Sequence, residues 1–201
     1  MLLGADAYSM RVFTGRKYGG IKQLMKAYEK ALGKASTAKE ATEFIIREYQ
    51  DKKIGLDGDI VLVADRREAI AVEYSLNEWG LQFSGPNPYL IRTNFFLVLR
   101  HLRHLPQEKG LYLSAVKRYE RAMEILSKTN INTTVDDLKE VCRDHYPEPS
   151  AMSICRHGGK GEYRTVGSVV IELVRNKIKI HYIAGMKPCQ GGYQTTQMRL
   201  R

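Results

Sequence analysis

The sequence predicts an α+β fold with largely antiparallel sheets. Helical and β-branched segments follow each other in the order helices, strands, helices, strands, which is typical of this class. Neighbouring strands are joined by short turns, as hairpins require. With 201 residues and 43% hydrophobic residues, the chain is long enough to bury one core, and it has no internal repeat. We therefore expect a single domain over residues 1–201, or a large piece of one.

The first part of the chain predicts two helices. Residues 1–20 are rich in glycine and show no periodic pattern, whereas apolar residues recur every three or four positions over residues 21–33. Thr37 and Glu40 have the spacing of a capping box, so a second helix should begin there and run to about Tyr49. The short link predicts an antiparallel helix pair. The expected inward face of the second helix is Ala41, Phe44, Ile45 and Tyr49.

Strands are predicted in the middle of the chain. Two β-branched runs, 59–64 and 69–74, should form a hairpin, because a short charged turn separates them. Glu73 lies inside the second run; we expect it on the solvent face, with a functional role as the alternative. Two more short strands are expected at 79–83 and 89–92.

The last half of the chain predicts two helices and then three strands. The helices should span residues 112–128 and 134–146, the second with acidic residues in its first turn, where the helix dipole favours them. Proline residues follow and end it. The three expected strands cover 153–157, 165–173 and 177–182.

The formal net charge of the chain is +10. Such a charge attracts nucleic acid, coenzyme A phosphates or acidic lipid. The basic residues are spread from Arg11 to Arg201, however, and no nucleic-acid motif accompanies them. Nucleic-acid binding driven by charge is therefore the weakest alternative, and a soluble surface is the simpler interpretation.

The cysteines and the hydropathy pattern bear on the compartment. Three cysteines cannot all pair, and their spacing is neither a CxxC nor a zinc pattern, so we expect reduced thiols and a cytoplasmic protein. No apolar run approaches the length of a membrane span. We expect no cofactor, no metal and no membrane partner.

A polar cluster at residues 153–157, Ser-Ile-Cys-Arg-His, should end the first strand of the last third. Polar side chains at the end of a strand are held still by the sheet and often form a site. Arg156 is costly to bury unless it meets a carboxylate or a ligand, a surface ion pair being the alternative. For Cys155 sheet packing is the simpler interpretation. The glycine-rich residues 158–161 should form a hairpin turn, since a strand and not a helix follows.

Other candidates have simpler interpretations. Cys142 and His145 lie three apart on a predicted helical face and could be a nucleophile and a base, although a buried core thiol is commoner. His101 and His104 could bind a metal, but a solvated helix explains them as well. We assign no chemistry to Cys189.

Several motifs together resemble one family. They are S-I-C-R-H at 153–157, T-V-x-S-V-V-I-E-L at 165–173, Pro188-Cys189, Arg92-Thr93-Asn94 and Lys117-Arg118-Tyr119-Glu120-Arg121. In this order they resemble the acyl-coenzyme A:isopenicillin N acyltransferase-like family of cysteine N-terminal-nucleophile (Ntn) hydrolases, from about Gly19 to the C-terminus. The resemblance implies an Ntn-hydrolase-like αββα sandwich that lacks its first strands.

The resemblance also implies a site. The family's nucleophile is a cysteine at the start of the mature chain, whereas this sequence begins with Met1 and its first cysteine is Cys142. We therefore expect the nucleophile on another polypeptide, or lost. Asn94 would donate to the oxyanion, with a turn-capping role as the alternative. Arg156 would orient the substrate or the nucleophile strand. Ser153 and His157 are the expected substrate-binding residues.

The expected function is that of the C-terminal portion of a cysteine Ntn hydrolase acting in amide hydrolysis or acyl transfer. Its substrate would be a small acyl or amide compound, with acyl-coenzyme A as a candidate donor. Missing strands leave a sheet edge unpaired, so we expect a second chain carrying the nucleophile, or a homo-oligomer. The alternative is a catalytically silent module that binds a ligand or assembles with itself.

Overall fold

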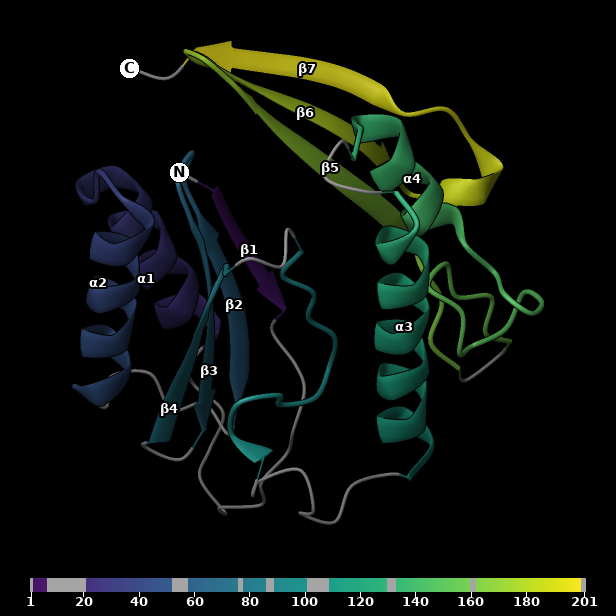
Figure 1. Ribbon diagram of the computed structural model, residues 1–201, viewed down its shortest axis with the longest axis horizontal. Coiled ribbons are helices and arrows are strands. Elements are labelled where there is room, and N and C mark those ends of the chain that lie inside the picture. Colours follow the sequence, from purple (N-terminus) through teal and green to yellow (C-terminus); the bar gives the residue numbers. More distant parts are fainter. Residues whose placement is uncertain are drawn as a thin grey trace. The chain divides into compact units, whose positions relative to one another are not determined.

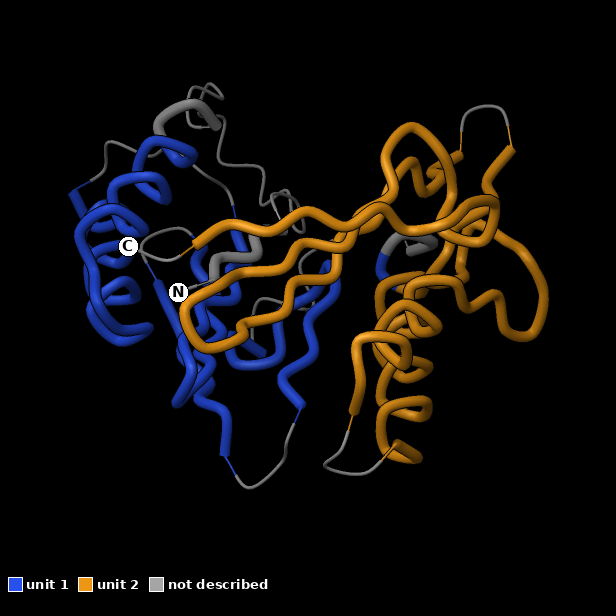
Figure 2. Tube along the Cα trace, turned by 90° about the horizontal axis from the view of Figure 1, so that it is seen from above, with its two compact units in different colours: residues 1–112 blue, residues 113–201 orange. Residues whose placement is uncertain are grey.

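The computed structural model describes residues 2–6, 21–51, 58–75, 78–85, 89–100, 109–129, 133–159 and 162–199. The chain divides into two compact units, Met1–Tyr112 and Leu113–Arg201, which Figure 2 shows in different colours. Helices and antiparallel sheets are mixed, so the predicted α+β class is confirmed. The single domain stays a prediction. No helix among the described residues has the length and apolar character needed to cross a membrane.

Unit 1 contains a four-stranded antiparallel sheet in sequence order (Figure 1). Three strands agree with the predicted ones, but β1 lies within residues 1–20, for which the sequence predicts no helix or strand. It is too short for a periodic signal, and it is held at the edge of the sheet by pairing with β2 from Leu2↔Ala64 to Asp6↔Ile60. The elements are β1 (Leu2–Asp6), α1 (Ile21–Lys34), α2 (Ala38–Gln50), β2 (Asp59–Ala64), β3 (Ala69–Ser75) and β4 (Glu78–Phe83).

Helices α1 and α2 pack on one face of this sheet and form the main core of unit 1 (Figure 1). The start of α2 is as predicted: the Thr37 side chain accepts a hydrogen bond from the Glu40 backbone N–H at 3.1 Å. The predicted inward face is also confirmed, with Phe44 only partly buried. The sheet contributes Val61, Val63, Ile70, Val72 and Tyr74 to this core.

A polar group is buried between α1, α2 and the start of β2. The hydroxyls of Tyr28 and Tyr49 lie 2.9 Å apart, and both donate hydrogen bonds to the carboxylate of Asp59, which is 1% exposed. Burial, and then the charge of Asp59, raises the pKa of both tyrosines above the usual value. The two hydroxyls therefore satisfy the Oδ2 atom of this buried carboxylate.

The opposite face of the sheet carries Glu73, and the prediction that this residue faces solvent is wrong. Its side chain is 0% exposed, because the segment 89–100 covers it. The carboxylate accepts hydrogen bonds from the backbone N–H groups of Leu97, Val98 and Leu99, at 2.8, 2.8 and 3.1 Å. It also lies 3.1 Å from Nε of Arg92. Backbone donors and a cation compensate for burial of the charge.

The strand predicted at 89–92 is wrong. These residues have no strand pairing; instead, Arg92 directs its guanidinium to Glu73 and to the side-chain oxygen of Gln82, 2.7 Å from Nη2. The residues 86–88, between the two strands predicted at 79–83 and 89–92, lie outside the described residues.

Unit 2 contains a three-stranded antiparallel sheet in the order β5-β6-β7 (Figure 1). The pairing of β5 with β6 runs from Gly167↔Ala184 to Val174↔Lys177, which confirms the predicted hairpin. The elements are α3 (Lys109–Ser127, which begins in unit 1), α4 (Val135–Arg143), β5 (Gly167–Val174), β6 (Lys177–Ala184), the 3-10 helix η3 (Pro188–Gln190) and β7 (Gln194–Arg199).

Two predictions for unit 2 are wrong. Residues 153–157 form no strand; they turn, with one isolated bridge between His157 and Arg164, and the third strand is β7 instead. Helix α4 ends at Arg143, three residues before the predicted end, because Asp144 is extended (ψ 137°) and its carbonyl accepts the N–H of Cys155 at 3.0 Å. His145 therefore lies outside the helix.

Candidate functional site

Four side chains of unit 2 converge at one point: His145, Cys155, His157 and Cys189. Nε2 of His157 lies 3.1 Å from Nε2 of His145, 3.3 Å from Sγ of Cys189 and 3.8 Å from Sγ of Cys155. The two sulfur atoms are 3.7 Å apart, and all four ligand atoms lie within 4.8 Å of one another. Two imidazoles and two thiols form a donor set that can hold a transition metal.

Helix α3 fixes the loop that carries three of these residues. Arg121 forms a bidentate ion pair with the carboxylate of Asp144, with Nη2 at 2.7 Å and Nε at 3.1 Å from the oxygens. The carbonyl of Asp144 accepts the N–H of Cys155, and the N–H of His157 donates to the carbonyl of Ser150 at 2.9 Å. The loop is thus held by contacts other than those of the four side chains.

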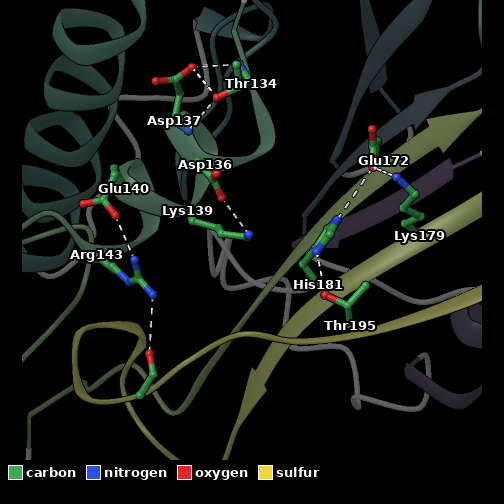
Figure 3. A network of polar contacts seen from close by, with 11 residues as sticks. Thr134, Asp136, Asp137, Lys139, Glu140, Arg143, Glu172, Lys179, His181 and Thr195 are labelled. Atoms are coloured by element: carbon green, nitrogen blue, oxygen red, sulfur yellow. Dashed lines mark hydrogen bonds and ion pairs between the residues drawn. The ribbon is translucent and has the colours of Figure 1, made fainter.

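The last turn of α4 holds the segment around Cys189. Arg143 donates from Nε to the carbonyl of Pro188 at 3.1 Å and from Nη2 to the carbonyl of Gly191 at 3.4 Å. Figure 3 shows Arg143 between Glu140 and this loop. At the other end of α4, Thr134 and Asp137 form a capping box. A well-capped helix therefore anchors the fourth member of the cluster.

Burial governs the electrostatics of the cluster. Cys155 is 0% exposed, and burial raises the pKa of its thiol to about 11. Burial, followed by the charges of Lys187 and His145, lowers the pKa of His157. The raised pKa disfavours the thiolate form of Cys155, whereas nucleophilic cysteines are thiolates with lowered pKa values.

A pocket of about 550 Å³ lies beside this cluster within unit 2. It brings together Ser153 and His157, the two predicted substrate-binding residues. The hydroxyl of Ser153 donates to the carbonyl of Glu148 at 2.9 Å and accepts the N–H of Ser150 at 3.0 Å. The lining consists of Lys117, Arg121, residues 146–154, His157 and Glu162.

The two predicted catalytic residues lie in different units. Arg156 belongs to unit 2, where its Nη2 donates to Oγ of Ser114 at 2.8 Å and its guanidinium lies 5.4 Å from the ring centre of Tyr163. Asn94 is half-buried in the irregular segment 89–100 of unit 1. A site shared by Asn94 and Arg156 stays a prediction. His101 and His104 lie outside the described residues.

The sequence did not reveal the four-residue cluster. The predicted face shared by Cys142 and His145 is wrong, because α4 ends before His145. The sequence predicts sheet packing for Cys155 and indicates no chemistry for Cys189. One signal was present: three of the four residues, two histidines and a cysteine, fall within the short stretch 145–157. Cys189 could not be added from spacing alone.

A second hollow of unit 2, about 620 Å³, lies between α4 and the sheet and includes Glu172 and His181. Nδ1 of His181 is 2.9 Å from Oγ1 of Thr195, and Nε2 is 3.8 Å from Glu172 (Figure 3). Lys179 pairs with the same carboxylate at 3.1 Å. Because these charged groups are matched to each other, we interpret this network as structural.

Comparison with known proteins adds no assignment. No protein-family model matches the chain, and no curated protein matches it significantly.

Proposed function

We propose that this chain is the C-terminal portion of a cysteine Ntn hydrolase that acts in amide hydrolysis or acyl transfer. The observation that carries the proposal is the pocket of unit 2, which Ser153 and His157 line together with Lys117 and Arg121. These residues come from two of the segments that resemble the family, 153–157 and 117–121. Two segments that are distant in the sequence therefore line the same pocket.

The chemistry of the pocket supports a small polar acyl compound. Lys117 and Arg121 contribute positive charge, and Glu148 and Glu162 contribute negative charge. Arg121 is paired with Asp144 and Glu124, which leaves Lys117 as the more available cation for a carboxylate or phosphate of the substrate. A mixture of charges suits an amide or thioester with a polar tail more than a purely apolar acyl chain.

The remaining catalytic groups complete the proposal. A cysteine on another polypeptide segment would attack the acyl carbon, with its own α-amine as the base. The amide of Asn94 would donate to the oxyanion, and Arg156 would orient the substrate or the nucleophile strand. Strands added from a second polypeptide would also pair the open sheet edge of the expected αββα sandwich.

The test is co-expression of the full chain with the polypeptides encoded beside it, followed by a fluorogenic N-acyl aminocoumarin assay and acyl transfer from acetyl-coenzyme A. We expect activity that iodoacetamide abolishes. Asn94→Ala should lower kcat by about 100- to 1,000-fold, as loss of an oxyanion donor does. Asn176→Ala, which changes an exposed asparagine in the turn between β5 and β6, is the control. Activity that resists iodoacetamide, or is unchanged by Asn94→Ala, contradicts the proposal.

A silent module gives a different result. If the chain binds acetyl-coenzyme A in calorimetry and Lys117→Glu weakens that binding, while no combination of polypeptides turns over substrate, the protein has kept only the pocket. Absence of both turnover and binding rejects both functions.

A further inference from the structure

We propose that His145, Cys155, His157 and Cys189 bind a single zinc ion through two imidazole nitrogens and two thiolate sulfurs. The inference concerns a metal site and does not depend on the proposed acyl chemistry.

The distances fit a tetrahedral ion. Bond lengths of about 2.3 Å for Zn–S and about 2.0 Å for Zn–N require roughly 3.3 to 3.8 Å between neighbouring ligand atoms. The four contacts measured in the cluster are 3.1, 3.3, 3.7 and 3.8 Å. The other two pairs, from His145 to each sulfur, are within 4.8 Å. An ion at the centre therefore needs only small side-chain adjustments.

Hydrogen bonds alone explain the cluster poorly. Nε2 of His157 faces three polar atoms at once, on His145, Cys155 and Cys189. A neutral imidazole nitrogen has either one proton or one lone pair, so it can make one good hydrogen bond, and thiols are weak donors. A metal ion would satisfy all four atoms together, because each can donate one lone pair to an ion that lies between them.

The donor set selects the metal. Thiolate and imidazole together favour zinc, whereas calcium and magnesium prefer oxygen ligands. A two-iron cluster of the Rieske type would hold the cysteines on one iron and the histidines on the other. Here one sulfur–nitrogen contact, 3.3 Å between Cys189 and His157, is shorter than the sulfur–sulfur contact. The sulfur and nitrogen atoms therefore surround the same point, as the ligands of a single ion do.

Four protein ligands leave no open position, so the site would be structural. The ion would join the loop after α4, which carries His145, Cys155 and His157, to the turn at η3, which carries Cys189. The same loop forms much of the pocket wall. Arg121 and Arg143 already hold both segments near their final positions, as second-shell partners of metal sites do.

The decisive experiment uses the unmodified full chain, purified without a histidine tag or chelator from zinc-supplemented cells. We expect one zinc per chain by elemental analysis. Replacement with cobalt should give thiolate-to-cobalt charge-transfer absorption and the visible bands of a tetrahedral ion. Zinc absent or lost on gel filtration, together with cobalt added to the metal-free chain giving no thiolate bands, would overturn the proposal.

Variants then test the ligands. Cys155→Ser and Cys189→Ser should each weaken zinc binding by more than about 100-fold, the upper range for loss of an outer-shell partner. Cys142→Ser removes the one cysteine of the chain that lies outside the cluster, and His181→Gln removes a histidine outside it. Both variants should retain one zinc. If the ligand variants are insoluble, X-ray absorption of the wild-type zinc protein decides instead. It should report two sulfur and two nitrogen neighbours, and a shell of oxygen and nitrogen alone contradicts the assignment.

Discussion

Sγ of Cys155 and Sγ of Cys189 lie 3.7 Å apart, although 34 positions separate the two residues in the sequence. The hairpin of β5 and β6 lies between them and returns the chain to the same place. This return, together with the turn that brings His157 and His145 together, produces the cluster on which the metal proposal rests.

Metal removal should destabilise unit 2. At free zinc 100 times above Kd, binding contributes about 2.7 kcal/mol to the free energy of unfolding. We expect a strong chelator to lower the melting temperature and to expose the loop at 146–157 to protease, because that loop has no strand pairing beyond one bridge. Differential scanning fluorimetry measures the melting temperature, and mass spectrometry of the fragments locates the cleavage. Added zinc should restore the melting temperature and the resistance to protease, and a melting temperature that the chelator leaves unchanged contradicts the expectation.

Arg121 should act as a positioning residue for the metal. Its bidentate pair with Asp144 fixes the backbone that holds Cys155. Arg121→Ala should therefore lower zinc affinity by roughly 10- to 100-fold, measured by competition with a chromophoric chelator. Arg199→Ala, on exposed β7, is the control. Equal affinities for the two variants would show that the loop does not depend on Arg121.

Glu73 should be essential to the stability of unit 1. Glu73→Gln removes the negative charge that pairs with Arg92 and places an amide against backbone N–H groups, so this buried ion pair loses its anion. We expect a loss of about 3 kcal/mol or more in the free energy of unfolding, as for other buried pairs deprived of one partner. Denaturant titration followed by the fluorescence of Trp79, the single tryptophan, measures it. Exposed Glu29→Gln should change little.

The tyrosines bonded to Asp59 should make unit 1 sensitive to alkali. Their pKa values are raised in the folded state, so the folded state retains protons that the unfolded state loses. Stability is therefore fully present below the ordinary pKa of about 10 and falls as the pH rises above it. The variant Tyr28→Phe/Tyr49→Phe should be less stable at pH 7 and less dependent on pH above 10. Tyr146→Phe, at an exposed site, should behave as wild type.

The sequence does not predict the cluster of four side chains, for a geometric reason. Two of its members, Cys155 and His157, belong to the polar run 153–157, which the sequence predicts to be the end of a strand. In that conformation alternate side chains share a face, and no partner is implied. The actual turn is set by the carbonyls of Asp144 and Ser150, which accept the N–H groups of Cys155 and His157. Local sequence patterns do not report such contacts.

The sequence by itself determined the α+β class, the helices α1 to α4 except for the end of α4, and the strands β2 to β6, because helical and strand periodicities are local properties of neighbouring residues. Only the tertiary structure decided what covers each face. Glu73 alternates with apolar neighbours as a solvent-facing residue would, yet the segment 89–100 folds over it and supplies donors. His145 and Cys189 likewise acquire their partners only when distant segments meet, since burial and ligand geometry depend on contacts that no local pattern encodes.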